Sequence, residues 1–344
     1  MKLKVIAIGP GLILTLAIAV FSRWLHGFLP GSWSAVLGEV VIGLSLGLII
    51  GNLWRPSLLF KPGLEFSFCT VLKIAIVLLG ARLSLQQVMQ IGGKAVLLIT
   101  LLILLALMVA HLLGRLTGVS GKLSTLIGVG TAICGNTAIT VTAPVIKARD
   151  EEVSFAIGAN TLIGTTAVFL YPVLGHQLGL SDTFFGTWAG VAVNDTSQVV
   201  ATGFAYSEQA GELATAVKLT RNALMGFVIV AIGYLYSKGS PNWERMSLFG
   251  KMRSSIPGFV IGFLVMAVLN SLGVFDRLSD LINRPVLQDM TYAAKFLILV
   301  ALTGVGFCTR LNDMRKIGLA PFVLALAAAL STSLVSYFVI RAFW

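Results

Sequence analysis

The chain has 344 residues, of which 57% are hydrophobic and 11% charged, and its mean hydropathy is +0.93. Soluble domains carry roughly 25% charged residues, so this composition excludes a soluble globular protein and indicates an integral membrane protein. The net charge of +11 does not indicate nucleic-acid binding, because Lys and Arg gather in the cytoplasmic loops of membrane proteins and no basic run alternates with aromatic residues.

Apolar stretches separated by Gly, Pro and charged residues predict an all-α polytopic membrane protein. At about 20 apolar residues per spanning helix, the chain holds about 11 membrane segments. We expect one transmembrane transporter domain over residues 1–344, with no soluble domain, and a retained first helix rather than a cleaved signal. The predicted segments are 5–22, 34–52, 66–82, 94–114, 122–147, 151–176, 182–207, 209–237, 255–273, 291–310 and 318–341.

Basic residues in the loops predict a cytoplasmic N-terminus. With this orientation, 13 Lys and Arg residues lie inside and 8 outside if every segment crosses the bilayer. If 122–147 and 182–207 are re-entrant hairpins, Lys147 and Arg149 move inside and the count becomes 15 to 6. Their length leaves both alternatives open, and either one places the longest polar segment, 238–254, in the cytoplasm.

Polar runs interrupt two of these apolar segments. Segment 122–147 is broken at Cys134, Gly135, Asn136 and Thr137, and segment 182–207 at Asn194, Asp195, Thr196 and Ser197. Discontinuous helices survive in membranes only where protein or a wet cavity surrounds the break, and a matched pair is typical of a transporter's substrate site. A simple kink with satisfied caps is the alternative. We expect the second halves to offer free amide N–H groups, which attract anions.

Four basic residues fall inside predicted spans: Lys73, Lys218, Arg221 and Lys295. Lys218 and Arg221 share a helix face and are candidates to supply fixed charge to an anion, or to pair with a carboxylate for structural reasons. Lys73 and Lys295 are candidates for coupling or for support around the site.

Asp195 is the clearest acidic residue deep in a predicted span. It could bind Na⁺, carry a proton or act as the counter-ion of Arg221, and we favour the counter-ion because a helix N-terminus stabilises its charged form. Asn160 and Asn222 follow the two breaks in sequence. They either line the same cavity or form interhelical hydrogen bonds.

Signatures of enzymes are missing from the sequence. It holds no zinc-protease, nucleophile-elbow, P-loop or dinucleotide-binding pattern, and the three histidines and three cysteines form no ligand cluster. We therefore expect no enzymatic activity, no cofactor and no metal. The sequence of residues 80–92 recurs loosely at 306–318. The spans that carry the two copies are predicted to cross the membrane in opposite directions, which predicts inverted repeats.

Three motifs resemble the sulfate exporter-like (YeiH-type) family of bacterial membrane proteins. They are Gly80-Ala-Arg-Leu-Ser-Leu, Cys134-Gly-Asn-Thr-Ala-Ile139 and Gly190-Val-Ala-Val-Asn-Asp-Thr-Ser-Gln-Val199, and the likeness covers nearly the whole chain. More distantly, residues 73–176 are similar to the first half of the bile acid:sodium symporter fold, within the cation–proton antiporter superfamily. The resemblance implies a bacterial inner-membrane protein whose discontinuous helices cross at the substrate site.

Two departures from that superfamily leave the coupling ion and the repeat order open. No pair of adjacent aspartates lies in a predicted span, and span 291–310 shows only Gly304 and Gly306 as a break.

We therefore expect a secondary transporter that moves a small anion, sulfate- or sulfonate-like or organic, by alternating access. The anion would lie between the second-half N-termini at Asn136 and Thr196. Coupling to H⁺ or Na⁺, a homodimer, the transport direction and the exact substrate stay open. The alternative is a non-transporting channel, or a sensor or scaffold subunit, although the sequence shows neither a repeated ring of one charge nor a soluble output domain.

Overall fold

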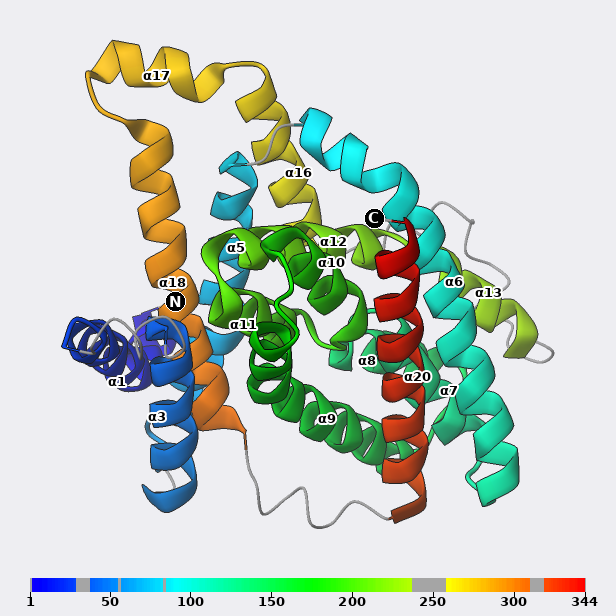
Figure 1. Ribbon diagram of the computed structural model, residues 1–344. Coiled ribbons are helices and arrows are strands. Elements are labelled where there is room, and N and C mark those ends of the chain that lie inside the picture. Colours follow the sequence, from blue (N-terminus) through cyan, green and yellow to red (C-terminus); the bar gives the residue numbers. More distant parts are fainter. Residues whose placement is uncertain are drawn as a thin grey trace. The chain divides into compact units, whose positions relative to one another are not determined.

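The computed structural model describes residues 2–28, 38–54, 57–82, 85–236, 258–309 and 319–343. All regular elements in these ranges are helices (Figure 1), which confirms the predicted all-α class. The predicted cytoplasmic segment 238–254 and most of the second sequence echo, residues 310–318, lie outside the described ranges.

Within the described residues, seven helices are long and apolar enough to cross a membrane. The bent pair Gly258–Ser271 and Val274–Ile282 would make an eighth span, and Glu39–Trp54 is a shorter apolar helix. Segments 122–147 and 182–207 are each split into two short helices. The polytopic architecture and both predicted interruptions are therefore confirmed.

The chain forms two compact units. Unit 1 comprises Met1–Met89 and Gly258–Leu311, and unit 2 comprises Gln90–Pro257 and Asn312–Trp344. That the two units work as one transporter domain stays a prediction.

Unit 1 is built around α18 (Val286–Cys308), which packs on α3 (Glu39–Trp54) and α5 (Leu72–Leu79). Small residues allow the close approach of α18 and α3: a Cβ at Gly51 would lie 2.8 Å from the carbonyl oxygen of Phe307, and one at Gly306 would lie 2.7 Å from the amide nitrogen of Leu48. Such small-residue contacts are typical of helix pairs in membranes. The elements of unit 1 are α1 (Lys2–His26), α3 (Glu39–Trp54), α4 (Lys61–Phe66), the π-helical η1 (Ser67–Val71), α5 (Leu72–Leu79), η2 (Gly80–Arg82), α16 (Gly258–Ser271), α17 (Val274–Ile282) and α18 (Val286–Cys308).

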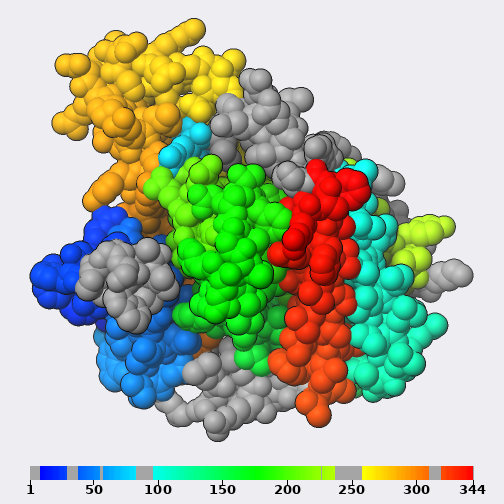
Figure 2. All heavy atoms as spheres, in the orientation of Figure 1, coloured from blue at the N-terminus to red at the C-terminus, as the bar shows by residue number. Residues whose placement is uncertain are grey.

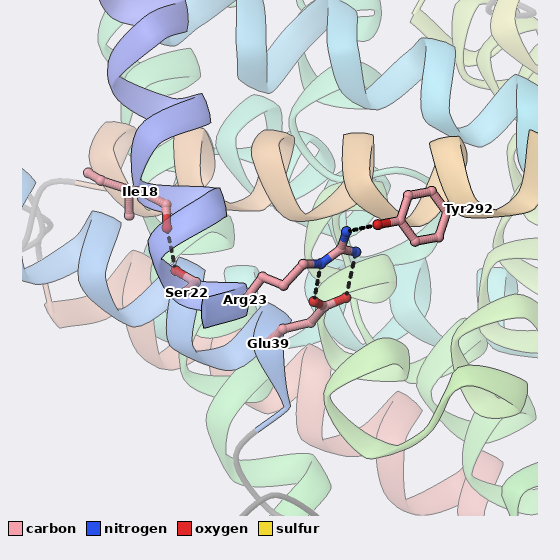
Figure 3. Close-up of polar contacts among 5 residues, drawn as sticks. All are labelled: Ile18, Ser22, Arg23, Glu39 and Tyr292. Carbon is pink, nitrogen blue, oxygen red and sulfur yellow. Dashed lines mark hydrogen bonds and ion pairs between the residues drawn. The ribbon is translucent and has the colours of Figure 1, made fainter. Parts of the chain in front are cut away.

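An ion pair joins three helices of unit 1 (Figure 3). The Arg23 Nε atom of α1 donates to Glu39 of α3 at 2.9 Å, and its Nη1 atom donates to the Tyr292 hydroxyl of α18 at 2.7 Å. The guanidinium carbon also lies 5.2 Å from the ring centroid of Phe296. These contacts hold together the C-terminal end of α1 and the N-terminal ends of α3 and α18.

Helix α17 is an element that the sequence analysis did not predict. It follows α16 at an angle of 69°, and Gly273 makes the turn with a φ of +68°. The helix buries Phe275 on one face and exposes Asp276 and Asp280. Its short length and charged residues hid it from a search for long apolar stretches.

In unit 2, the long helix α9 (Asp150–Gln177) packs on the half-helices α7 (Gly121–Ala132), α8 (Asn136–Val145) and α11 (Thr196–Tyr206), and the half-helix α10 (Asp182–Ala192) packs on α12 (Glu208–Ala223). In Figure 2, α20 (red) lies on the surface of this unit between green residues from the middle of the chain and the cyan residues of α6. The elements are α6 (Leu85–Thr117), which begins at the end of unit 1, α7 (Gly121–Ala132), α8 (Asn136–Val145), α9 (Asp150–Gln177), α10 (Asp182–Ala192), α11 (Thr196–Tyr206), α12 (Glu208–Ala223), α13 (Met225–Tyr236) and α20 (Leu319–Phe343).

Candidate functional site

The first interrupted segment is a hairpin that returns to the side on which it starts. The Lys122 ammonium, in the first turn of α7, donates to the carbonyl of Lys147, just after α8, at 2.6 Å. Ser120, whose hydroxyl caps α7, also donates to the Glu152 carboxylate at the start of α9. Both ends of the segment therefore lie together at the N-terminal end of α9.

The second interrupted segment is also a hairpin. The Ser207 hydroxyl, just after α11, donates to the Asp182 carboxylate at the start of α10 at 2.6 Å. Tyr206 donates to the Leu180 carbonyl, and its ring stacks on His176 near the end of α9, with ring centroids 4.3 Å apart. The base of this hairpin therefore lies at the C-terminal end of α9.

The two hairpins enter unit 2 from opposite ends of α9, which is 28 residues or about 42 Å long. The structure thus favours the re-entrant alternative over the crossing one for both segments. The hairpins meet at their tips, because a Cβ at Gly135 would lie 2.9 Å from the Asp195 carboxylate and 2.8 Å from the Asn160 amide nitrogen. Gly135 has φ +66° and ψ −125°, a conformation that only glycine adopts readily.

Asparagines from the following helices hold the start of each second half-helix. The Asn160 amide of α9 donates to the Asn136 side chain at the start of α8, at 2.9 Å. The Asn222 amide of α12 donates to the Thr196 hydroxyl at the start of α11, at 3.2 Å. The two predicted candidates Asn160 and Asn222 therefore occupy equivalent places, one at each hairpin tip.

The two N-termini differ in how they are capped. Asp195 caps α11, since its Oδ1 atom accepts from the Ser197 amide at 3.0 Å and from the Ser197 hydroxyl at 2.6 Å. Helix α8 has Gly135 as its N-cap, with no side-chain cap, and Thr137 in its first turn is exposed. The start of α8 is therefore the open helix N-terminus, with the partial positive charge that such an end carries.

Lys218 and Arg221 of α12 lie at the C-terminal ends of the first half-helices, α10 and α7. Lys218 donates to the carbonyls of Val193, at 2.9 Å, and of Asn194, which follow α10. Arg221 donates to the Thr131 and Ala132 carbonyls at the end of α7 and to the Val191 carbonyl at 2.7 Å. Both side chains are fully buried, at 0% and 1% exposure. They satisfy carbonyls that the broken helices leave without intrahelical partners.

Two expectations about these cations need correction. We expected Lys218 and Arg221 to bind the anion beside the second-half N-termini, whereas their hydrogen bonds go to the C-terminal ends of the first halves. We also expected Asp195 to be the counter-ion of Arg221, but the guanidinium bonds carbonyls and Asp195 caps α11. The physical reason is that an interrupted helix has a partly negative C-terminal end, which attracts a cation as strongly as the N-terminal end attracts an anion.

With Lys218 and Arg221 both counted as protonated, the formal charges leave a positive excess at the hairpin tips. The two partly positive N-termini offset the two partly negative C-termini. Among the described residues, the Asp195 carboxylate interacts electrostatically with Lys218, and its charge would cancel one of the two positive charges. Since desolvated charge is costly in a membrane, a bound anion would bring the site close to neutrality.

Several buried polar atoms at the tips have no hydrogen-bond partner within the described residues. They are Asn160 Oδ1, Asn194 Nδ2 and Oδ1, Gln198 Oε1 and Asn222 Oδ1. Buried polar groups are normally satisfied, so this cluster indicates a place for water or a polar ligand. Gln198 was not among the predicted site residues, although a glutamine next to the second break in an apolar segment was a usable signal.

Three predicted residues remain, of which two belong to unit 1 and one is buried in unit 2. Lys73, exposed on α5, and Lys295, half-buried on α18, belong to unit 1. Cys134 is buried and its thiol lies 3.4 Å from the Met225 sulfur. The part of the chain that the structure describes holds no group of three or more His, Cys, Asp or Glu side chains placed to bind a metal ion.

Comparison with known proteins gives a consistent family match. Residues 10–325 match the model of a family described as conserved hypothetical protein 698. A UPF0324 membrane protein of Clostridium tetani is 32% identical, with 96% of this chain and 95% of the relative covered. UPF0324 membrane proteins of Streptococcus agalactiae and Fusobacterium nucleatum are 34% and 32% identical, each with 95% of both chains covered.

Proposed function

The chain belongs to the conserved hypothetical protein 698 family, together with the UPF0324 membrane proteins, and we propose that it is a secondary transporter of a small anion. The observation that carries this proposal is the pair of hairpin tips in unit 2, with their net positive charge and the uncapped N-terminus of α8. Sulfate, sulfonates and small carboxylates are the ligand class that such a site suits, since backbone amides at a helix N-terminus bind oxyanions.

The opposed hairpins suit alternating access. Each hairpin has its base at one end of α9, and the tips meet between those ends, so water could reach the tips from one side while the other hairpin closes the path. Asp195 lies at the contact between the tips and is the residue most suited to link anion binding to H⁺ or Na⁺. By this proposal the protein works in the bacterial inner membrane with its N-terminus in the cytoplasm, as the basic residues of the loops suggest.

The test is to change the charge at the open N-terminus of α8. Asn136→Asp adds one negative charge at the first residue of α8, where an acidic side chain favours the helix. This added negative charge would cancel the positive excess at the hairpin tips. We expect sulfate to stabilise the wild-type protein against thermal unfolding, and the variant to bind sulfate at least ~10-fold more weakly.

Gly121→Asp is the matched control. It adds the same charge at the first residue of α7, at the far end of the same hairpin, where a Cβ meets no atom within 4 Å. This variant should bind sulfate like the wild type. Sulfate counterflow in proteoliposomes then separates a carrier, which exchanges sulfate across the membrane, from a channel or a scaffold. The proposal is wrong if sulfate, methanesulfonate and acetate all fail to stabilise the wild-type protein.

A further inference from the structure

Helix α17 of unit 1 has one apolar face and one charged face. The spacing of its apolar residues places them on one side of the helix; they are Val274, Phe275, Leu278, Leu281 and Ile282. The charged residues Asp276, Arg277 and Asp280 lie on the other side and are exposed. A helix with this pattern is stable where it has an apolar neighbour on one side and water on the other.

Residues in the left-handed conformation set the direction of α17 at both ends. Gly273, with a φ of +68°, precedes the helix, and Asn283, with a φ of +51°, follows it. The axis of α17 makes an angle of 69° with that of α16. Because membrane-spanning helices are tilted by about 20° on average from the bilayer normal, α17 runs closer to the plane of the membrane than to its normal.

The apolar face of α17 is directed toward the membrane. The helix packs on α16 and α18, and in Figure 1 it lies across the ends of these two helices, which both run away from it on the same side. Phe275, 6% exposed, is the buried residue of α17 and therefore marks the side that faces the bilayer. Leu278, Leu281 and Ile282 share this side but are 39%, 81% and 50% exposed.

Lipid is the neighbour that fits this exposed apolar surface. The surface continues along α16, where Val265, Val268 and Leu272 are also exposed, and α16 belongs to a membrane-span candidate. A second copy of the chain fits less well, because a helix of nine residues is only about 14 Å long and about 10–12 Å wide. A stable protein interface buries about 800 Å² on each partner, which is far more than this face offers.

We propose that α17 is an interfacial helix that binds the lipid surface, with Leu278, Leu281 and Ile282 among the acyl chains next to the headgroups. Helices of this kind bury their apolar face by about 5–10 Å and keep their charged face in water. The charged side chains of α17 are two acids and one arginine, so apolar burial drives the binding and anionic headgroups are not selected.

The membrane topology of this part of the chain follows from the proposal. Helices α16 and α17 are not one bent span. The chain turns at the membrane surface along α17, and α18 leads it back into the bilayer. The inference concerns unit 1 and does not depend on the proposed transport.

Fluorescence quenching in nanodiscs measures the depth of the two faces. The exposed residues Cys69 and Cys308 are replaced by alanine in the full-length protein, and either Ile282→Cys or Asp280→Cys then carries a bimane label. These two positions lie about 200° apart around the helix. Phosphatidylcholine with a spin label near the headgroup end of its acyl chain should quench the Ile282 label at least ~3-fold more than the Asp280 label, and aqueous iodide should do the reverse. Replacing part of the phosphatidylcholine by phosphatidylglycerol should leave both results unchanged.

Ile261→Cys on α16 is the standard for a label in the hydrocarbon core. Ile261 is 53% exposed and lies about 15 Å before the end of α16, which is half of the core thickness of about 30 Å. A spin label near the methyl end of the acyl chain should quench this label best, whereas the Ile282 label should respond best to the spin label near the headgroup.

Four results would overturn the proposal. Equal quenching of both α17 labels by lipid would show a bent span, and equal quenching of both by iodide would place α17 in water. An Ile282 label that neither quencher reaches would show that another chain covers the face. Lipid quenching that requires phosphatidylglycerol would contradict the apolar driving force. No anion is added as a ligand, so failure here leaves the sulfate result unaffected, and the converse also holds.

Discussion

At the scale of single residues, the buried cations show how a membrane protein can tolerate interrupted helices. Each break leaves carbonyl groups that water cannot satisfy. Lys218 and Arg221 supply hydrogen bonds and positive charge to these carbonyls from one face of α12. The sequence analysis proposed both residues for an anion site, whereas their hydrogen bonds go to main-chain carbonyls. The spacing of two cations on a helix does not reveal which end of a neighbouring half-helix they will meet.

Arg221→Met tests this structural role. The substitution keeps most of the side-chain volume but leaves the Thr131, Ala132 and Val191 carbonyls without their donor, so we expect a loss of about 3 kcal/mol or more in the free energy of unfolding. The measurement is the thermal midpoint of the purified protein in detergent. Arg115→Met, at an exposed position on α6, should change stability by less than about 0.5 kcal/mol. Equal midpoints for the two variants would contradict the role.

Asp195→Asn separates the capping role of this residue from its charge. Asparagine caps helices about as well as aspartate, so the fold should lose less than about 1 kcal/mol. Without a titratable carboxyl group, anion uptake into proteoliposomes should lose its dependence on pH while sulfate binding persists or strengthens. Uptake at several external pH values measures this, with wild-type protein in parallel. A variant that keeps the wild-type pH profile would exclude Asp195 as the site of a coupling proton.

At the scale of elements, the two interruptions were predictable and their geometry was not. Glycine and polar residues within apolar segments mark Gly135 and Asp195 as break points from sequence alone. Whether the chain then crosses or returns depends on contacts at the far ends of the half-helices. Lys122 with Lys147, and Ser207 with Asp182, close the two hairpin bases. Such contacts join positions that no helical periodicity relates, so the sequence pattern left both alternatives open.

Helix α17 shows a different limit of sequence reasoning. Its amphipathic pattern is readable, but a search for long apolar spans passes over a helix of nine residues. Similarly, the sequence shows Gly51 and Gly306 only as glycines in apolar segments and does not reveal their contacts with another helix. Their function in bringing α3 and α18 together depends on which helix is the neighbour, and that is a tertiary property.

At the scale of the whole molecule, the re-entrant hairpins change the membrane topology that the sequence permits. If the N-terminus is cytoplasmic, as we propose, two returns instead of two crossings give the 15 to 6 distribution of basic residues, with Lys147 and Arg149 on the cytoplasmic side. This distribution obeys the positive-inside rule more closely than the alternative of 13 to 8. Hydrogen bonds at the hairpin bases and the loop charges, which are independent observations, therefore favour the same topology.

Single-cysteine labelling tests this topology directly. The exposed residues Cys69 and Cys308 are first replaced by alanine, while the buried Cys134 remains. Exposed reporter positions are available before and after each hairpin: Arg115 and Glu151 flank the first, and Thr183 and Gln209 flank the second.

The four positions distinguish the two topologies because Glu151→Cys and Thr183→Cys lie on opposite sides of the membrane in the two cases. With re-entrant hairpins and a cytoplasmic N-terminus, Arg115→Cys and Glu151→Cys should react with a membrane-impermeant maleimide only after the cells are opened. Thr183→Cys and Gln209→Cys should react in intact cells. If both segments crossed the bilayer, Glu151→Cys would react in intact cells and Thr183→Cys would be protected. The labelling of Arg115→Cys and Gln209→Cys would be the same in both topologies. Arg115→Cys and Gln209→Cys therefore serve as internal standards for the inside and the outside. Labelling of Glu151→Cys in intact cells would refute the first hairpin even if the second were correct.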